Sequence, residues 1–201
     1  GAIHMHNQMH DDGLNDMRRN IDAWWPAIEA GAEAILINAS GCGSTVKEYG
    51  FHLQNDAQYA QKAQRVSELA KDIVEILIGE TEGLKALFSL APSAATLAYH
   101  PPCSLQHGQK LGGKVETLLS GLGYPVLLPK DSHLCCGSAG TYSFLQPELS
   151  GRLLQNKVNN LEALQPKAVL SGNIGCIAHI GSGTDIPVMH WIEYLDQQLG
   201  N

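Results

Sequence analysis

Four of the five cysteines in this 201-residue chain lie in its C-terminal half, in an arrangement that could hold metal. Cys135 and Cys136 are adjacent in the string His-Leu-Cys-Cys-Gly, Cys103 lies upstream and Cys176 lies downstream. Adjacent cysteines have Cα atoms too close together for an ordinary disulfide. Their thiolates can instead bind one ion or two irons of one cluster, and soft thiolates select zinc or iron-sulfur centres. The spacing therefore predicts a metal site.

The composition indicates a globular protein of a reducing compartment. An odd number of cysteines argues against a closed disulfide framework, so we expect a cytoplasmic setting. We find no cationic segment followed by an apolar core at the N-terminus, and no stretch of about 18 apolar residues, so we expect neither a signal peptide nor a membrane span. The net charge of −7 argues against nucleic acid as a partner, and 44% hydrophobic residues suffice for a core.

The C-terminal half repeats the order strand, cysteine-bearing loop, helix. We predict strands over 96–100, 126–128 and 168–170, which lead to Cys103, to Cys135 with Cys136, and to Cys176. Apolar residues at helical spacing predict helices over 111–122, 145–164 (with Pro147 in its first turn) and 190–199. This alternation predicts an α/β fold with a parallel sheet. Because the carboxyl ends of parallel strands meet at one edge, that edge should gather all four cysteines.

The sequence of the N-terminal half predicts fewer helices and strands. A helix is expected over 14–28, although Pro26 should kink or end it. A buried strand over 34–38 leads to Cys42, and a second helix is expected over about 56–77.

The two halves resemble each other. An offset of 134 residues places Cys42 on Cys176 and Gly41 on Gly175, and helix, strand and Gly-Cys loop then follow in the same order. Gly1 falls close to Gly137 in this alignment, as though a Cys-Cys pair had preceded it. We therefore predict two pseudo-repeated units, each with a parallel sheet and flanking helices. They are residues 1–90, truncated at the N-terminus with Cys42 as the remaining ligand, and residues 91–201.

The cysteine pattern resembles a known family. Cys103, the Cys135-Cys136-Gly137 string and Cys176, in this order, resemble the cysteine-rich CCG domain of heterodisulfide reductase, lactate-utilisation iron-sulfur proteins and glycolate oxidase iron-sulfur subunits. Five longer strings are most similar to the C-terminal part of the glycolate oxidase subunits: residues 20–26, 39–43, 47–50, 131–142 and 190–193. The resemblance covers essentially the whole chain, without the ferredoxin-like cluster domain that the family carries at its N-terminus.

The resemblance implies electron transfer. In this family a separate flavin subunit removes a hydride equivalent from glycolate, and the iron-sulfur subunit passes single electrons to an acceptor such as a membrane quinone. The expected partners are therefore the flavin subunit, the ferredoxin-like domain of the same subunit and a quinone, with a cytoplasmic location or a peripheral one on the inner face of the plasma membrane. The residues agree, because no paired carboxylates, nucleophile triad or phosphate-binding loop appears at convincing spacing. The chain is thus expected to be a non-catalytic component of the oxidase.

The sequence leaves the metal open. The family pattern in its fullest form ends in Cys-x-x-Cys, whereas this chain has Cys176-Ile-Ala-His179. Four cysteines suit a conventional [4Fe-4S] cluster, and three cysteines with a histidine suit zinc. The nitrogen candidates are His179, His107 and His133. The histidines that flank Cys103, His100 and His107, are interpreted mainly as accessory or helix-capping groups.

Three functional hypotheses follow. The first is an electron-transfer module with Cys103, Cys135, Cys136 and Cys176 as ligands. The second is a structural module, zinc-bound or metal-free, that assembles the flavin subunit with the ferredoxin-like domain. The third and weaker one is a thiol redox enzyme that uses Cys135 and Cys136 as a vicinal dithiol.

Overall fold

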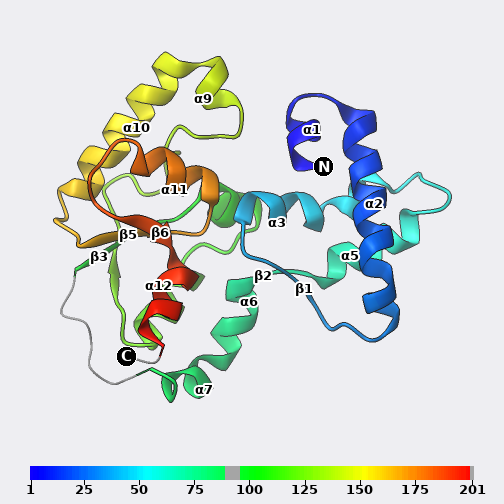
Figure 1. The fold of residues 1–201 in the computed structure, drawn as a ribbon, viewed down its shortest axis with the longest axis horizontal. Helices are drawn as coiled ribbons and strands as arrows, with labels where there is room; N and C mark the ends of the chain where they lie inside the picture. Colours follow the sequence, from blue (N-terminus) through cyan, green and yellow to red (C-terminus); the bar gives the residue numbers. More distant parts are fainter. Residues whose placement is uncertain (89–95, 200–201) are drawn as a thin grey trace. The chain divides into compact units, whose positions relative to one another are not determined.

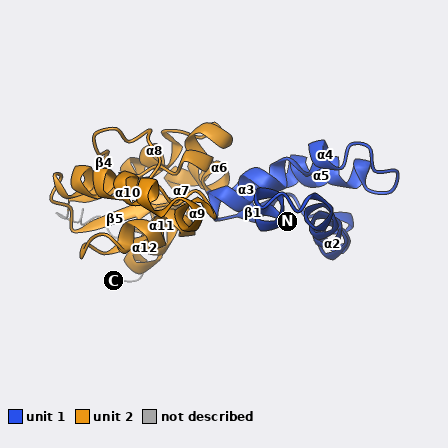
Figure 2. Cartoon of the chain, turned by 90° about the horizontal axis from the view of Figure 1, so that it is seen from above, with its two compact units in different colours: residues 1–73 blue, residues 74–201 orange. Residues whose placement is uncertain are grey.

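The computed structural model describes residues 1–88 and 96–199, which form two compact units. Unit 1 is Gly1–Ile73 and unit 2 is Val74–Asn201 (Figure 2). The boundary that we expected, between residues 90 and 91, lies outside the described residues and stays a prediction.

Unit 1 combines helices with a short parallel strand pair. Its elements are α1 (Ala2–His6), α2 (His10–Glu29), β1 (Ile35–Ile37), α3 (Ser40–Lys47), α4 (Tyr49–His52), α5 (Ala60–Leu69) and β2 (Ala70–Asp72). Strand β1 pairs with β2 in parallel, with Ile35 opposite Ala70. The core of the unit is made by buried side chains of α2, α4 and α5, among them Met17, Tyr49 and Val66.

Helix α2 includes Pro26 and ends at Glu29, so the proline does not end the helix directly, and a kink there stays a prediction. Two other expectations for unit 1 were wrong in detail. Strand β1 is not fully buried, since Leu36 is 55% exposed. The helix expected over 56–77 is interrupted by β2, which separates α5 from α6 (Ile73–Leu77). The apolar residues on both sides keep a helical spacing, so this three-residue strand was not visible in the pattern.

Unit 2 is an α/β layer structure (Figure 1). Its further elements are η1 (Ile78–Glu80), α7 (Thr81–Lys85), β3 (Leu97–His100), the short π-helix η2 (Ser104–Gly108), α8 (Lys114–Gly121), β4 (Val126–Leu127), α9 (Tyr142–Leu145), α10 (Pro147–Glu162), β5 (Ala168–Ser171), α11 (Ile174–Gly181), β6 (Val188–His190) and α12 (Trp191–Gln198). The four strands pair in parallel in the order β4-β3-β5-β6. The α/β fold with parallel sheets is therefore confirmed.

The strand order of unit 2 contains a reversal. From β3 the chain moves outward to β4, and from there it crosses back over β3 to β5 and continues to β6. Helices α10 and α11 contact each other, and the right-handed crossovers that parallel strands almost always use would place α8 on the opposite face of the sheet. The order thus reverses between β3 and β5, and the crevice at the carboxyl ends of two such strands is where open α/β sheets bind ligands.

The two units share one local arrangement. In each, a strand is followed by a helix and pairs in parallel with a later strand: β1, α3 and β2 in unit 1, and β5, α11 and β6 in unit 2, although α4 and α5 also lie between α3 and β2. Cys42 is the third residue of α3, and Cys176 is the third residue of α11. Both units therefore present a cysteine in the first turn of the helix that follows a parallel strand.

In the part of the chain that the structure describes, no helix combines the length and the apolar character that crossing a membrane requires.

Candidate metal centre

Four cysteines of unit 2 meet at the carboxyl edge of its sheet. Cys103 follows β3, Cys135 and Cys136 follow β4, and Cys176 follows β5. Their side chains form a row of hydrogen-bonding thiols in which Cys103 contacts Cys135, Cys135 contacts Cys136, and Cys136 contacts Cys176. We call these four residues the cysteine centre. The prediction that one edge gathers them is confirmed, while their role as metal ligands stays a prediction.

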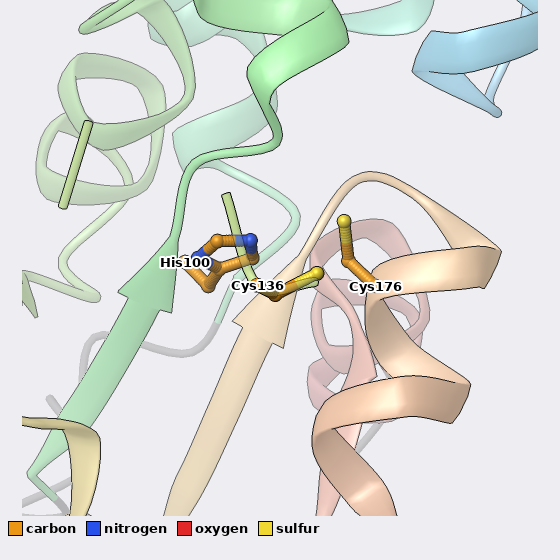
Figure 3. Close-up of side chains that lie close together, drawn as sticks. All are labelled: His100, Cys136 and Cys176. Atoms are coloured by element: carbon orange, nitrogen blue, oxygen red, sulfur yellow. The ribbon is translucent and has the colours of Figure 1, made fainter. Parts of the chain in front are cut away.

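A histidine lies beside this row (Figure 3). One ring nitrogen of His100 and the Sγ atoms of Cys136 and Cys176 all lie within 4.8 Å of one another, and all three residues are buried. His100 is the last residue of β3, and its side chain is 0% exposed. Sequence reasoning treated it as an accessory group. The signal that could have found it is its position at the end of the same strand that leads to Cys103.

The His100 ring is not paired in the usual way. Neither Nδ1 nor Nε2 makes a hydrogen bond of normal geometry to any group of the described residues, although the Cys176 thiol lies beside the ring. An unsatisfied buried donor or acceptor costs about 1–3 kcal/mol. A buried polar group of this kind calls for a partner such as a metal ion.

Glycine shapes the loop that carries the adjacent cysteines. Gly137 has a φ of +100°, and a Cβ atom there would lie 2.5 Å from the Ser150 carbonyl oxygen. The backbone N–H of Gly137 donates to Cys135 Sγ at 3.3 Å. Only glycine adopts this turn without strain while α10 packs so closely, so the Cys-Cys-Gly string is held against that helix.

Helix α11 begins with a side-chain cap. The side-chain oxygen of Asn173 accepts hydrogen bonds from the backbone N–H groups of Gly175 and Cys176, at 2.9 and 3.4 Å. Such a cap satisfies N–H groups that the first turn of a helix leaves without partners. It thereby fixes the turn that presents Cys176.

Two side chains of η2 connect the loops that carry Cys103 and Cys135. Gln106 Nε2 donates to the Pro101 carbonyl oxygen at 3.0 Å and to the Ser132 carbonyl oxygen at 3.5 Å. His107 Nε2 lies 3.1 Å from the His133 carbonyl oxygen. Short π-helical segments are frequent at functional sites. Here the segment joins the ends of β3 and β4 next to the cysteines.

The row of thiols divides into donors and acceptors. The Cys103 thiol and, second, the Cys136 thiol lower the pKa of Cys135, and the Cys136 thiol lowers the pKa of Cys176 to about 6. The pKa of Cys136 is raised by its hydrogen bond to Cys135 and then by that to Cys176, and the pKa of Cys103 is raised by its hydrogen bond to Cys135 and by burial. The thiols of Cys103 and Cys136 thus stabilise thiolates at Cys135 and Cys176. The thiolate is the form of cysteine that binds metals.

A buried cation lies close to the centre. Lys157 of α10 is 2% exposed, and its Nζ donates to the Asp131 carbonyl oxygen at 2.9 Å. Burial lowers its pKa, and the charges of Cys136, Asp131 and the other cysteines oppose that shift. Lys157 and Cys135 line the same pocket, which has a volume of about 230 Å³. A positive charge here compensates negative charge on the thiolates.

The remaining predicted ligands lie elsewhere. Cys42 is an exposed residue of unit 1, where it lines a pocket of about 480 Å³. His179 Nε2 lies 3.1 Å from Ser150 Oγ. His107 and His133 are joined by the hydrogen bond between η2 and the loop before Cys135. Binding of metal by Cys42 or His179 stays a prediction.

The donor set fits a soft metal centre. Four sulfur atoms form one row, and the donors of His100, Cys136 and Cys176 lie within 4.8 Å of one another and are buried. The backbone around them is fixed by a cap and a glycine turn. Thiolate with imidazole is the chemistry of zinc and iron-sulfur sites. The residues therefore fit either group.

Comparisons with known proteins agree with this donor set. A family described as "CCG: Cysteine-rich domain" matches residues 97–181, which include all four cysteines of the centre. The chain is 52% identical over 199 residues to the glycolate oxidase iron-sulfur subunit of Escherichia coli, a match that covers 99% of this chain and 48% of that protein. It is also 30% identical to YkgE of E. coli, with 84% of this chain and 72% of YkgE covered.

A third relative has a related name. Lactate utilization protein A of Geobacillus thermodenitrificans is 27% identical over 182 residues, with 84% of this chain and 72% of that protein covered. The chain spans about half the length of the E. coli glycolate oxidase subunit and nearly three quarters of the other two.

Proposed function

The chain belongs to the cysteine-rich CCG family, and from this we propose that its cysteine centre holds an iron-sulfur cluster that transfers electrons in a 2-hydroxy-acid oxidase. The observation that carries the proposal is the row of four contacting thiols at the strand-end edge, inside the segment that matches the family.

The residues of unit 2 would hold the cluster and set its surroundings. Cys103, Cys135, Cys136 and Cys176 are the proposed ligands, and a [4Fe-4S] cluster would take up and release single electrons. The capped helix α11 and the turn at Gly137 keep the thiolates in place without the cluster. Lys157 supplies a positive charge that compensates the charge of the ligands.

The oxidation of substrate would occur on another protein. Two relatives are named for glycolate oxidation and for lactate utilization, so a small 2-hydroxy acid is the proposed substrate class. Hydride removal needs a cofactor such as a flavin, and we assign it to a flavin-containing partner subunit. This chain would then be a non-catalytic electron-transfer component, in the cytoplasm or at the membrane surface, with a ferredoxin-like domain and a quinone as further partners.

The metal content tests the proposal. Iron, zinc and acid-labile sulfide should be measured per chain on anaerobically purified protein, together with the visible spectrum. Iron and sulfide in near-equal amounts, with sulfur-to-iron charge-transfer absorption, are expected. Zinc alone, or no metal with five free thiols, would contradict electron transfer by this chain.

One observation favours a second candidate. One metal ion that binds cysteine sulfur and histidine nitrogen at about 2.0–2.3 Å holds its donors within about 4.6 Å of one another. The donors of His100, Cys136 and Cys176 lie within 4.8 Å, so a small movement of these side chains would bring them into that range. A zinc ion at this place would make the chain a structural module that assembles the flavin and ferredoxin-like partners. The same metal analysis distinguishes the two candidates, because zinc has a full d shell and adds no colour.

A further inference from the structure

The position of His100 is fixed by the centre of the sheet. Strand β3 lies between β4 and β5, and all four of its residues are buried. His100 pairs with Ser171 in the register of β3 and β5, and Ser171 Oγ donates to the His100 carbonyl oxygen at 2.9 Å. The ring therefore cannot reach solvent by a small movement of the backbone.

Strand geometry directs the ring toward the cysteines. Side chains alternate between the faces of a sheet, so His100 shares a face with Ala98. Ala98 belongs to the buried cluster that contains Cys136 and Cys176. Figure 3 shows the imidazole at the end of β3, beside the side chains of Cys136 and Cys176.

The other histidines near the centre have a different environment. His107 Nε2 lies against the His133 carbonyl oxygen, and His179 Nε2 lies against the Ser150 hydroxyl. Among these histidines, His100 alone is fully buried and has no regular hydrogen bond at either ring nitrogen within the described residues. One of its ring nitrogens comes within 4.8 Å of the Sγ atoms of Cys136 and Cys176.

From these contacts we propose that His100 is a ligand of the metal centre, bound through one ring nitrogen next to Cys136 and Cys176. The inference rests on the proposed metal centre, but it does not depend on whether the metal is iron or zinc. The centre is thereby offered four sulfurs and one nitrogen.

A nitrogen ligand has a consequence for redox chemistry. Imidazole binds as a neutral donor, whereas each thiolate adds a negative charge. Histidine in place of cysteine raises the reduction potential of an iron-sulfur centre, as in Rieske clusters. A centre that includes His100 would accept electrons more readily than one held by thiolates alone.

Cobalt(II) provides a probe that serves both candidate functions. Metal-free protein, prepared anaerobically as the full chain with and without ¹⁵N-labelled histidine, would be titrated with Co²⁺ alone. Pulsed electron paramagnetic resonance of the Co²⁺ form should show a nitrogen coupling that changes with the label. No label-dependent coupling in the wild type would overturn the proposal.

Substitutions assign the coupling to one residue. His100→Asn should lose the coupling and bind Co²⁺ at least about tenfold more weakly, because changes even outside the ligand set cost 10–100-fold in affinity. His100→Cys should restore tight binding with stronger sulfur-to-cobalt absorption and without the coupling. His107→Asn is the matched control and should keep the label-dependent coupling, because its ring contacts the His133 carbonyl oxygen and not the sulfurs.

The outcomes separate this inference from the proposed function. A labelled coupling that survives in folded His100→Asn protein would overturn the ligand assignment. If His100→Asn does not fold, as judged by circular dichroism, the assignment is made with His107→Asn, His133→Asn and His179→Asn. If all three variants keep the label-dependent coupling, the result supports His100 as the nitrogen ligand. Loss of the coupling in any one of them contradicts that assignment. Zinc instead of iron in the native protein would refute electron transfer and leave this test unchanged.

Discussion

The hydroxyl of Ser150 donates a hydrogen bond to the carbonyl oxygen of Gly137 at 2.9 Å. The same hydroxyl lies 3.1 Å from His179 Nε2, so it accepts a hydrogen bond when that nitrogen carries the proton. Ser150 is almost fully buried in α10. One side chain of that helix therefore links the Cys-Cys-Gly turn to α11, which carries Cys176.

Removing the Ser150 hydroxyl should destabilise unit 2. Ser150→Ala leaves a buried carbonyl oxygen and an imidazole without their partner, which should cost about 1–3 kcal/mol of unfolding free energy. Urea unfolding of the metal-free protein measures this loss of unfolding free energy. The control is Ser120→Ala at an exposed position of α8, which has the same change in helix propensity and should be neutral or slightly stabilising. Equal effects of the two substitutions would contradict the linking role.

The turn at Gly137 should not accept a side chain. In Gly137→Ala the positive φ should cost about 1–3 kcal/mol, and the clash of Cβ with the Ser150 carbonyl should add about 1–3 kcal/mol. Gly123→Ala is the matched control, because Gly123 has a φ of +92° but no atom within 4 Å of a Cβ atom. Urea unfolding of Gly123→Ala should show only the cost of the positive φ and not that of a Cβ clash. A Gly137 variant as stable as the Gly123 variant would mean that α10 moves away easily.

Cys136 should be essential for metal binding. Cys136→Ser replaces the buried thiol that contacts both Cys135 and Cys176, so metal content per chain should fall to background while circular dichroism stays largely unchanged. Serine is a harder and much less acidic donor, which explains the expected loss. Cys42→Ser, made in parallel, measures separately the exposed candidate ligand of unit 1. Unchanged metal in Cys136→Ser protein would refute the site assignment.

The charge of Lys157 should influence the reduction potential. Reduction adds negative charge to a cluster, so loss of a nearby buried cation should make the midpoint potential more negative. Lys157→Met removes the charge and keeps most of the side-chain volume. Arg152→Gln removes an exposed charge from the same helix, where solvent and salt screen it, and should have little effect. Equal potentials of the wild type and Lys157→Met would show that the ammonium does not act on the centre.

The metal-free protein should become more stable as the pH rises from about 6 toward 9. The pKa of Cys176 falls from 9.0 to about 6 in the folded state, so the unfolded chain binds more protons in this window. Cys135, whose pKa is also lowered, contributes with the same sign. This stability is lost as the pH falls through about 6, and above 9 the raised pKa values of Cys103 and Cys136 reverse the trend.

Urea midpoints at several pH values, with chelator and reductant present, measure this dependence. Cys176→Ala should have a smaller slope between pH 6 and 9 than the wild type. A wild-type stability that does not change over this range would show that Cys176 remains protonated in the folded protein.

The sequence by itself determined the alternation of strands, helices and cysteine loops in unit 2. Helical spacing of apolar residues located α8, α10 and α12, and Pro147 lies in the first turn of α10 as predicted. Because parallel strands direct their carboxyl ends to one edge of the sheet, this order of elements also predicts that Cys103, Cys135, Cys136 and Cys176 lie together. These signals are local in the chain, and for that reason a sequence pattern can contain them.

Only the tertiary structure decided which histidine lies with the cysteines. His107 and His179 are near cysteines in the sequence, but the His107 ring contacts the loop before Cys135 and the His179 ring contacts Ser150 of α10. His100 reaches Cys176 because the strand order places β3 beside β5, and that pairing joins residues 71 positions apart. The buried charge of Lys157 and the steric limit at Gly137 depend on how α10 packs against the loop. Contacts between distant segments follow from packing, whereas the period of a local pattern records only which face of an element is buried.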